Sequence, residues 1–149
     1  LCAWKDEPRV HVLYDRMAYK ADQENLPLDK KWVSETKNSF FCFPLIHSTP
    51  KKGVQYRFSS LCDRGHFGIP KVIFGEGGAH HCILDINGEY GMTHGAIGIG
   101  VNDMEEGKEM VDIILSNQFK KLMDACCFSS YRIDWNVLAL FSKQKLLNL

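Results

Sequence analysis

The chain has 149 residues and a hydrophobic content of 45%, which fits one globular domain with a hydrophobic core. No apolar run approaches the roughly 18 residues needed to cross a bilayer, so the sequence excludes a transmembrane span. The first residues turn charged at once, so we expect no secretory signal peptide, and 18 basic and 18 acidic residues give a formal net charge of zero.

The zero net charge is an average over unequal segments. Between Lys37 and Lys71, six basic residues stand against the single acid Asp63, which gives a net charge of +5 (six minus one). Residues 72–149 carry ten acids and six bases, which gives −4. One basic segment in a neutral chain is a candidate polyanion-binding surface, and a solvated loop with lysines would show the same pattern.

The first predicted elements are short. The order is a β-prone run over residues 10–14, a polar loop over residues 15–31, and a helical turn over residues 31–35. Residues 40–47 are aromatic and aliphatic and predict a buried strand, in which Pro44 argues for an edge position or a bend. Residues 49–53 predict a turn, and the apolar–polar alternation of residues 54–58 predicts a half-buried strand. These two strands form a predicted hairpin.

A second group of strands follows. Residues 71–74 predict a strand that stops at a run of glycines. Residues 82–86 and 89–92 flank Asn87-Gly88, and they predict a hairpin because both turn residues tolerate positive φ. Residues 96–101 predict one more strand.

The pattern then changes to helices. Asp103 and Glu106 form a predicted capping box for a helix with apolar spacing through Asn117. Ser116 and Asp134 are predicted to cap a second and a third helix. Strands followed by helices indicate the α+β class: a mixed or antiparallel sheet with hairpins in residues 40–101, then two or three C-terminal helices, in a single domain over residues 1–149.

The six cysteines stand at positions 2, 42, 62, 82, 126 and 127, and none forms a Cys-x-x-Cys pair. The usual spacings of zinc sites and thioredoxin-like centres are therefore absent. Since the chain shows no export signal, we expect reduced thiols in a cytoplasmic protein.

Two hypotheses other than a non-catalytic nucleic-acid-binding module remain open. His80, His81 and Asp85 offer metal-ligating side chains for a small metal-dependent nuclease or hydrolase, although adjacent histidines on a strand point to opposite faces. The other hypothesis is a protein-interaction module that docks partners through its apolar helices.

The segment from Arg57 to Lys71 interleaves cations, hydroxyls and aromatic side chains. Lysine and arginine neutralise phosphates, Ser59 can fix a phosphate, and Arg64 or His66 can read a base edge. A surface loop with a Gly-His turn would have the same composition.

Four motifs in this order carry a resemblance: residues 43–53, residues 57–60, Gly65-His-Phe-Gly-Ile-Pro-Lys-Val-Ile-Phe74, and Asp85-Ile-Asn-Gly-Glu-Tyr-Gly-Met-Thr-His-Gly95. The sequence resembles the C-terminal target-recognition domain of adenine-specific DNA methyltransferases, the TaqI-like specificity domain of restriction–modification enzymes. The resemblance covers roughly residues 10–142, and its most specific part is residues 65–74 combined with residues 88–93.

The resemblance implies DNA recognition without catalysis. The methylating domain of that family carries an Asn/Asp-Pro-Pro-Tyr/Phe motif that holds the flipped adenine, and no Pro-Pro occurs here. The glycine motif that holds S-adenosylmethionine also has no convincing counterpart. We therefore expect no catalytic residue, metal or cofactor in this chain. The expected partners are double-stranded DNA and an N-terminal methyltransferase domain of the same polypeptide, which would bind S-adenosylmethionine and precede Leu1; no membrane is involved.

By similarity to the family, Ser48, Lys51 and Lys52 are expected to contact the DNA backbone, and Ser59, the Gly65–Phe67 loop and Lys71 to lie near DNA. Together with the charge pattern, this gives the predicted DNA-binding set: Ser48, Lys51, Lys52, Arg57, Ser59, Arg64, His66 and Lys71.

Overall fold

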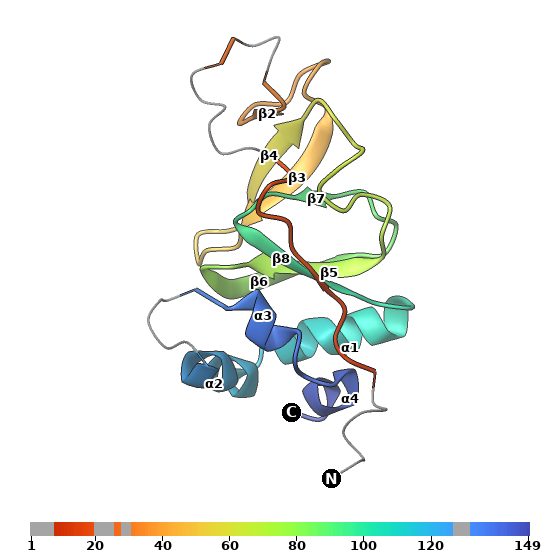
Figure 1. The fold of residues 1–149 in the computed structure, drawn as a ribbon, viewed down its shortest axis with the longest axis vertical. Coiled ribbons are helices and arrows are strands. Elements are labelled where there is room, and N and C mark those ends of the chain that lie inside the picture. The colour runs from red at the N-terminus through yellow and green to blue at the C-terminus, as the bar shows by residue number, and fades with distance from the viewer. Residues whose placement is uncertain (1–7, 20–25, 28–30, 127–131) are drawn as a thin grey trace.

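The computed structural model describes residues 8–19, 26–27, 31–126 and 132–149. Within these residues the chain forms two stacked four-stranded sheets and a layer of helices at one end (Figure 1). Strands dominate the first hundred residues and helices the rest, so the predicted α+β class is confirmed.

The lower sheet in Figure 1 lies against the helices and is antiparallel throughout. Its strand order is β1 (Val12–Leu13), β8 (Ala96–Gly100), β5 (Lys71–Gly75) and β6 (Gly78–Asp85). Every residue of β5 is buried, since β8 and β6 flank it and the helices and the upper sheet cover its two faces. The predicted strands over residues 10–14, 71–74 and 96–101 are all present.

The upper sheet has the order β2 (Val33–Ser34), β4 (Gln55–Ser59), β3 (Phe43–Ser48) and β7 (Gly91–Met92). The predicted hairpin of β3 and β4 is confirmed. The helical turn predicted over residues 31–35 is wrong, because Val33 and Ser34 pair with the end of β4. The edge position argued from Pro44 holds only locally: Pro44 pairs with Phe58 of β4, and β7 pairs with the next two residues of β3.

The hairpin predicted around Asn87-Gly88 is also wrong. β6 pairs with β5 through the Gly75–Gly78 turn, whereas β7 runs parallel to β3 in the other sheet. The carboxylate of Asp85 gives the physical reason: it accepts hydrogen bonds from the backbone N–H groups of Glu89, at 2.8 Å, and Tyr90, at 3.0 Å. Those donors are therefore occupied, and the chain crosses to the upper sheet.

The helices are α1 (Met104–Ile114), α2 (Asn117–Cys126), α3 (Trp135–Leu138) and α4 (Lys143–Leu147). The predicted caps are present: Asp103 accepts from the N–H of Glu106 at 2.8 Å, Ser116 from Phe119 at 3.2 Å and Asp134 from Asn136 at 2.8 Å. The carboxylate of Glu106 reaches back to the N–H of Asn102. Helix α4, capped by Ser142, was not predicted.

Alternating side chains divide the core between the layers. Val72 and Phe74 pack toward the helices, while Ile73 packs between the two sheets. In the upper sheet, Ile46 faces the gap between the sheets and Leu45 faces the outer side, where Tyr19 covers it. Successive side chains of a strand point to opposite faces of the sheet. Beyond Leu45, positions on the outer face of the upper sheet can therefore carry polar side chains.

Candidate nucleic-acid interface

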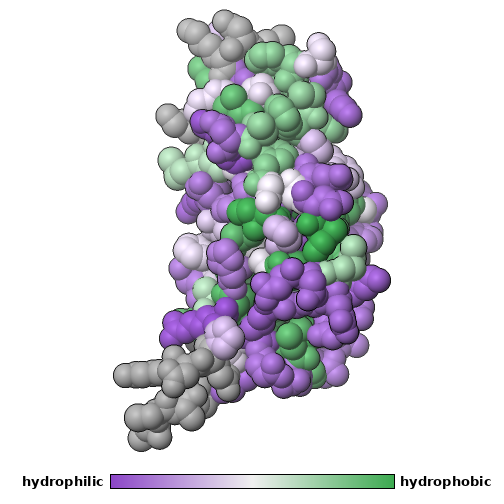
Figure 2. Space-filling model, turned by 90° about the vertical axis from the view of Figure 1, so that its right-hand side faces the viewer, coloured by the Kyte–Doolittle hydropathy of each residue, from purple (hydrophilic) through white to green (hydrophobic). Residues whose placement is uncertain are grey.

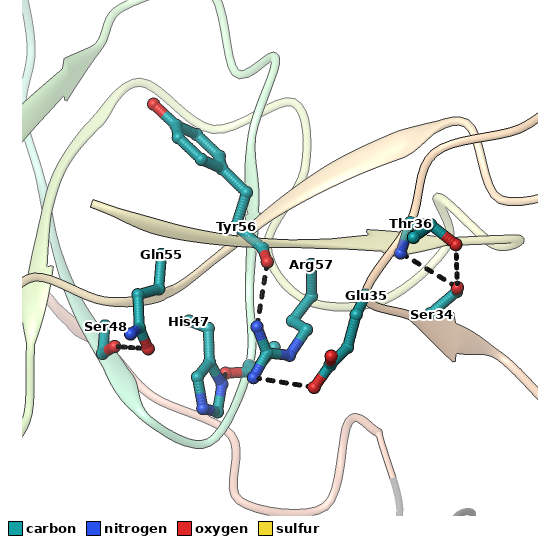
Figure 3. Close-up of polar contacts among 9 residues, drawn as sticks. Ser34, Glu35, Thr36, His47, Ser48, Gln55, Tyr56 and Arg57 are labelled. Atoms are coloured by element: carbon teal, nitrogen blue, oxygen red, sulfur yellow. Dashed lines mark hydrogen bonds and ion pairs between the residues drawn. The ribbon is translucent and has the colours of Figure 1, made fainter. Parts of the chain in front are cut away.

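A β-bulge shapes the polar end of the β3–β4 hairpin. Ile46 pairs with Tyr56 and Ser48 pairs with Gln55, so His47 is an extra residue without a partner on β4. The bulge allows both His47 and Ser48 to project from the same side as Gln55, as Figure 3 shows. We call His47, Ser48, Gln55 and Arg57 the hairpin face.

Each side chain of the hairpin face has a neighbour that orients it. The hydroxyl of Ser48 donates to Oε1 of Gln55 at 2.8 Å, and the imidazole Nδ1 of His47 lies 2.7 Å from the hydroxyl of Thr93. Nη2 of Arg57 lies 3.4 Å from the carboxylate of Glu35, and Nη1 donates to the carbonyl of Tyr56 at 3.1 Å. Figure 3 shows Tyr56 pointing to the opposite side of the strand.

His47 is a neutral member of this face. Burial, followed by the nearby charges of Arg57 and His94, lowers the pKa of its imidazole below the ordinary value. The ring of His94 lies edge-on, with ring centroids 5.8 Å apart. Arg57 is therefore the cation of the hairpin face at neutral pH, and the carboxylate of Glu35 partly neutralises its charge.

The turn at the tip of the hairpin carries two exposed lysines, Lys51 and Lys52. Thr49 anchors this turn to the lower sheet: its buried hydroxyl accepts from the N–H of Gly75 at 2.8 Å and donates to the carbonyl of Gly78 at 2.9 Å. The turn therefore holds two ammonium groups on a fixed base, beside the hairpin face.

Arg64 and His66 belong to a different surface. They lie in the loop between β4 and β5, on the right of Figure 1, whereas the turn with Lys51 lies on the left. The guanidinium of Arg64 lies 4.5 Å from the ring centroid of Trp32 and 3.1 Å from the carboxylate of Asp63, so its charge is partly neutralised. Figure 2, which faces the right-hand side, shows apolar atoms at mid-height that interrupt the hydrophilic surface.

Ser59 and Lys71 lie inside the protein, so the expectation that they face DNA is corrected. Both residues have 0% exposure. The hydroxyl of Ser59 bonds to the backbone of Leu61, and the ammonium of Lys71 lies 2.7 Å from the carboxylate of Asp85. Charged residues are rarely fully buried unless they are paired, and the pairing with Asp85 explains this exception.

The two most specific segments of the resemblance contact each other. The N–H of Gly68 donates to the carbonyl of Gly88, and the N–H of Met92 donates to the carbonyl of Gly65, both at 2.9 Å. A Cβ on Gly88 would lie 2.5 Å from the backbone of Gly68, and one on Gly91 would lie 2.4 Å from the ring of Phe67. These motif glycines are needed for close packing, so the motif builds the frame that holds the two sheets and the connecting loops.

The three residues of the hydrolase hypothesis, all of them described by the structure, do not form one metal site. His80 is exposed and its neighbour His81 is half-buried on β6, while the carboxylate of Asp85 is engaged by Lys71 and two backbone N–H groups. In the described part of the chain, no three His, Cys, Asp or Glu side chains are grouped so that they could hold a metal ion.

The interaction-module hypothesis assumed apolar helix surfaces. Most of the apolar helical side chains pack against the lower sheet instead, among them Met110, Ile114, Phe119, Met123 and Leu138. None of the helices within the described ranges has the length and apolar character that crossing a bilayer requires.

Four residues of the predicted DNA-binding set lie together on the β3–β4 hairpin: Ser48, Lys51, Lys52 and Arg57. The predicted set did not contain their neighbours Gln55, His47, His94 and Glu35. Gln55 and Arg57 are two residues apart on β4, so their side chains lie on the same face of the strand. The apolar–polar alternation of residues 54–58 therefore indicated that Gln55 lies beside Arg57. The bulge at His47 and the approach of Glu35 depend on tertiary packing and leave no comparable pattern in the sequence.

Comparisons of this chain with protein-family models, with curated proteins and with solved structures find no match.

Proposed function

We propose that this chain is a sequence-specific DNA target-recognition domain of an adenine-specific DNA methyltransferase in a cytoplasmic restriction–modification system. A methylating domain in the same polypeptide would bind S-adenosylmethionine and carry out the chemistry. The observation that carries the proposal is the β3–β4 hairpin, which presents Ser48, Gln55 and Arg57 on one face with Lys51 and Lys52 at its tip.

The chemistry of this hairpin suits duplex DNA. The major groove admits a two-stranded β-ribbon, and its floor offers hydrogen-bond donors and acceptors that side chains such as Arg, Gln and Ser can read. Lysines beside such a ribbon can neutralise phosphates and release counterions. The resemblance to the TaqI-like specificity domain independently favours the same partner.

The anchoring of the hairpin also supports the proposal. Thr49 ties the tip to the Gly75–Gly78 turn, and β7 pairs with the other side of β3. A recognition element that keeps its shape avoids the entropy of ordering when it binds.

Equilibrium binding to a labelled mixed-sequence duplex, measured from about 50 to 200 mM salt, tests the proposal. We expect log K to fall linearly with log salt concentration for the unmodified chain. The double variant Lys51→Ala/Lys52→Ala should bind more weakly and lose about 0.9 of slope for each lost phosphate contact.

The matched control is Lys120→Ala/Lys121→Ala, which removes the same charge from exposed positions on α2. It should keep the slope of the unmodified chain. No binding at the lowest salt concentration, or an equal loss of slope in the two double variants, would contradict the proposal.

A further inference from the structure

We infer that Gln55 and Arg57 read bases in the major groove, and that Ser48 and Glu35 are positioning residues that hold them. This inference rests on the proposed function and assigns sequence discrimination to two named side chains. Lys51 and Lys52, by contrast, would supply affinity without sequence preference.

The spacing of the two side chains fits a duplex. Gln55 and Arg57 alternate with Tyr56 on β4 and therefore share one face (Figure 3). Side chains two residues apart on a strand are about 6.7 Å apart. Successive base pairs rise about 3.4 Å, so a strand that runs along the groove brings these side chains to base pairs two steps apart.

Arg57 has the donors and the constraint that guanine recognition needs. Its guanidinium makes two contacts, with the carboxylate of Glu35 and the carbonyl of Tyr56, and a guanidinium has more N–H donors than these contacts use. The remaining donors can form the bidentate pair with O6 and N7 of guanine. The side chain is only 26% exposed, whereas that of Glu35 is 80% exposed, so Arg57 is the more constrained partner.

Gln55 has the complementary pattern for adenine. Its Oε1 accepts from the hydroxyl of Ser48 at 2.8 Å, and a carbonyl oxygen has a second lone pair. That lone pair can accept from N6 of adenine while the amide N–H₂ donates to N7. Ser48 thereby holds the amide in place, and the pair Gln55 and Arg57 predicts a target that contains both adenine and guanine.

The different surroundings of the cations separate their roles. Arg57 is fixed by two contacts on a paired strand, whereas Lys51 and Lys52 are exposed on a turn. Contacts to phosphates position a protein on DNA and contacts to base edges specify the sequence. The fixed, forked side chain therefore suits base reading, and the long exposed ammonium groups suit phosphates.

The experiment begins with selection of duplexes from a randomised library by the unmodified chain. Affinities are then measured for the selected duplex and for each single base-pair substitution, with the unmodified chain and with Arg57→Lys, Gln55→Ala, Glu35→Gln and Lys51→Ala/Lys52→Ala. Thermal unfolding of each variant identifies any that do not fold, and Gln55→Ala and Arg57→Lys test the inference independently of each other.

We expect the unmodified chain to discriminate by about 5-fold to 150-fold at one guanine and at one adenine two base pairs away. Arg57→Lys removes the planar fork and should lower the preference at the guanine alone, and Gln55→Ala should lose the preference at the adenine alone. Glu35→Gln should lower discrimination at the guanine without reducing the salt slope, which a merely structural role would not do. Lys51→Ala/Lys52→Ala should weaken binding to all duplexes by the same factor.

A substitution profile that Arg57→Lys and Gln55→Ala leave unchanged would overturn the inference, and so would salt-dependent binding without any selected sequence. In the first case the proposed function would stand. In the second case DNA binding would remain, and the sequence specificity in the proposed function would be overturned with the inference. Absence of binding to any duplex would overturn the proposed function and the inference together.

Discussion

The ammonium of Lys71 lies 2.7 Å from the carboxylate of Asp85, and the two side chains are only 0% and 2% exposed. Burial lowers the pKa of Lys71, and the hydrogen bond and charge of Asp85 oppose that shift. Because Asp85 also accepts from Glu89 and Tyr90, this ion pair joins the start of β5, the end of β6 and the segment that crosses to the upper sheet.

Removal of the cation should be costly. In Lys71→Met the carboxylate of Asp85 is left buried without its counter-ion, so the free energy of unfolding should fall by about 3–5 kcal/mol. Urea denaturation measures the loss. The double variant Lys71→Met/Asp85→Asn removes the uncompensated charge and should recover part of it. A loss below about 1 kcal/mol in Lys71→Met would show that the pair does not stabilise the fold as described.

Gly88 should tolerate no side chain. Its φ is +68°, and a Cβ there would lie 2.5 Å from the backbone of Gly68. Gly88→Ala should therefore lower the free energy of unfolding by at least about 2 kcal/mol, through left-handed strain and overpacking. The control Gly77→Ala has nothing within 4 Å of the added Cβ and should change stability by less than about 0.5 kcal/mol. Similar losses in the two variants would contradict the packing of residues 65–68 against residues 88–91.

Stability should decrease on mild acidification. Burial lowers the pKa of His47 and of His66, so the folded chain keeps these imidazoles neutral where the unfolded chain binds protons. Their contribution is present above the ordinary histidine pKa of about 6.5 and is lost as the pH falls from there toward the lowered folded values. The melting temperature should therefore fall between about pH 7.5 and 5.5.

Two single variants test whether these two histidines cause the pH dependence of the melting temperature. His47→Gln and His66→Gln should each reduce it, because burial lowers the pKa of both imidazoles. An unchanged profile in both variants would contradict this assignment.

Local patterns in the sequence predicted much of the fold. The alternation of residues 54–58 after the turn at residues 49–53 predicted the β3–β4 hairpin, and Asp103, Ser116 and Asp134 predicted three helix starts. These signals act within a few residues, where capping and turn formation are decided.

The failures came from contacts between distant residues. Asn87-Gly88 forms a turn but no hairpin, because Asp85 captures the donors that follow it. The sequence around Lys71 predicts a surface cation, but its partner Asp85 lies fourteen positions away on the paired strand and allows it to be buried. The candidate site shows the same division: charge predicted Lys51 and Arg57, while the bulge that brings His47 beside Ser48 required the tertiary structure.

Backbone amide NMR during a titration with duplex DNA tests most directly whether DNA binds the hairpin face, as we propose. We expect the largest chemical-shift changes within residues 47–57 and 93–95, with little change in α1 and α2. Changes concentrated in α1 and α2, or no changes at low salt concentration, would contradict the proposal.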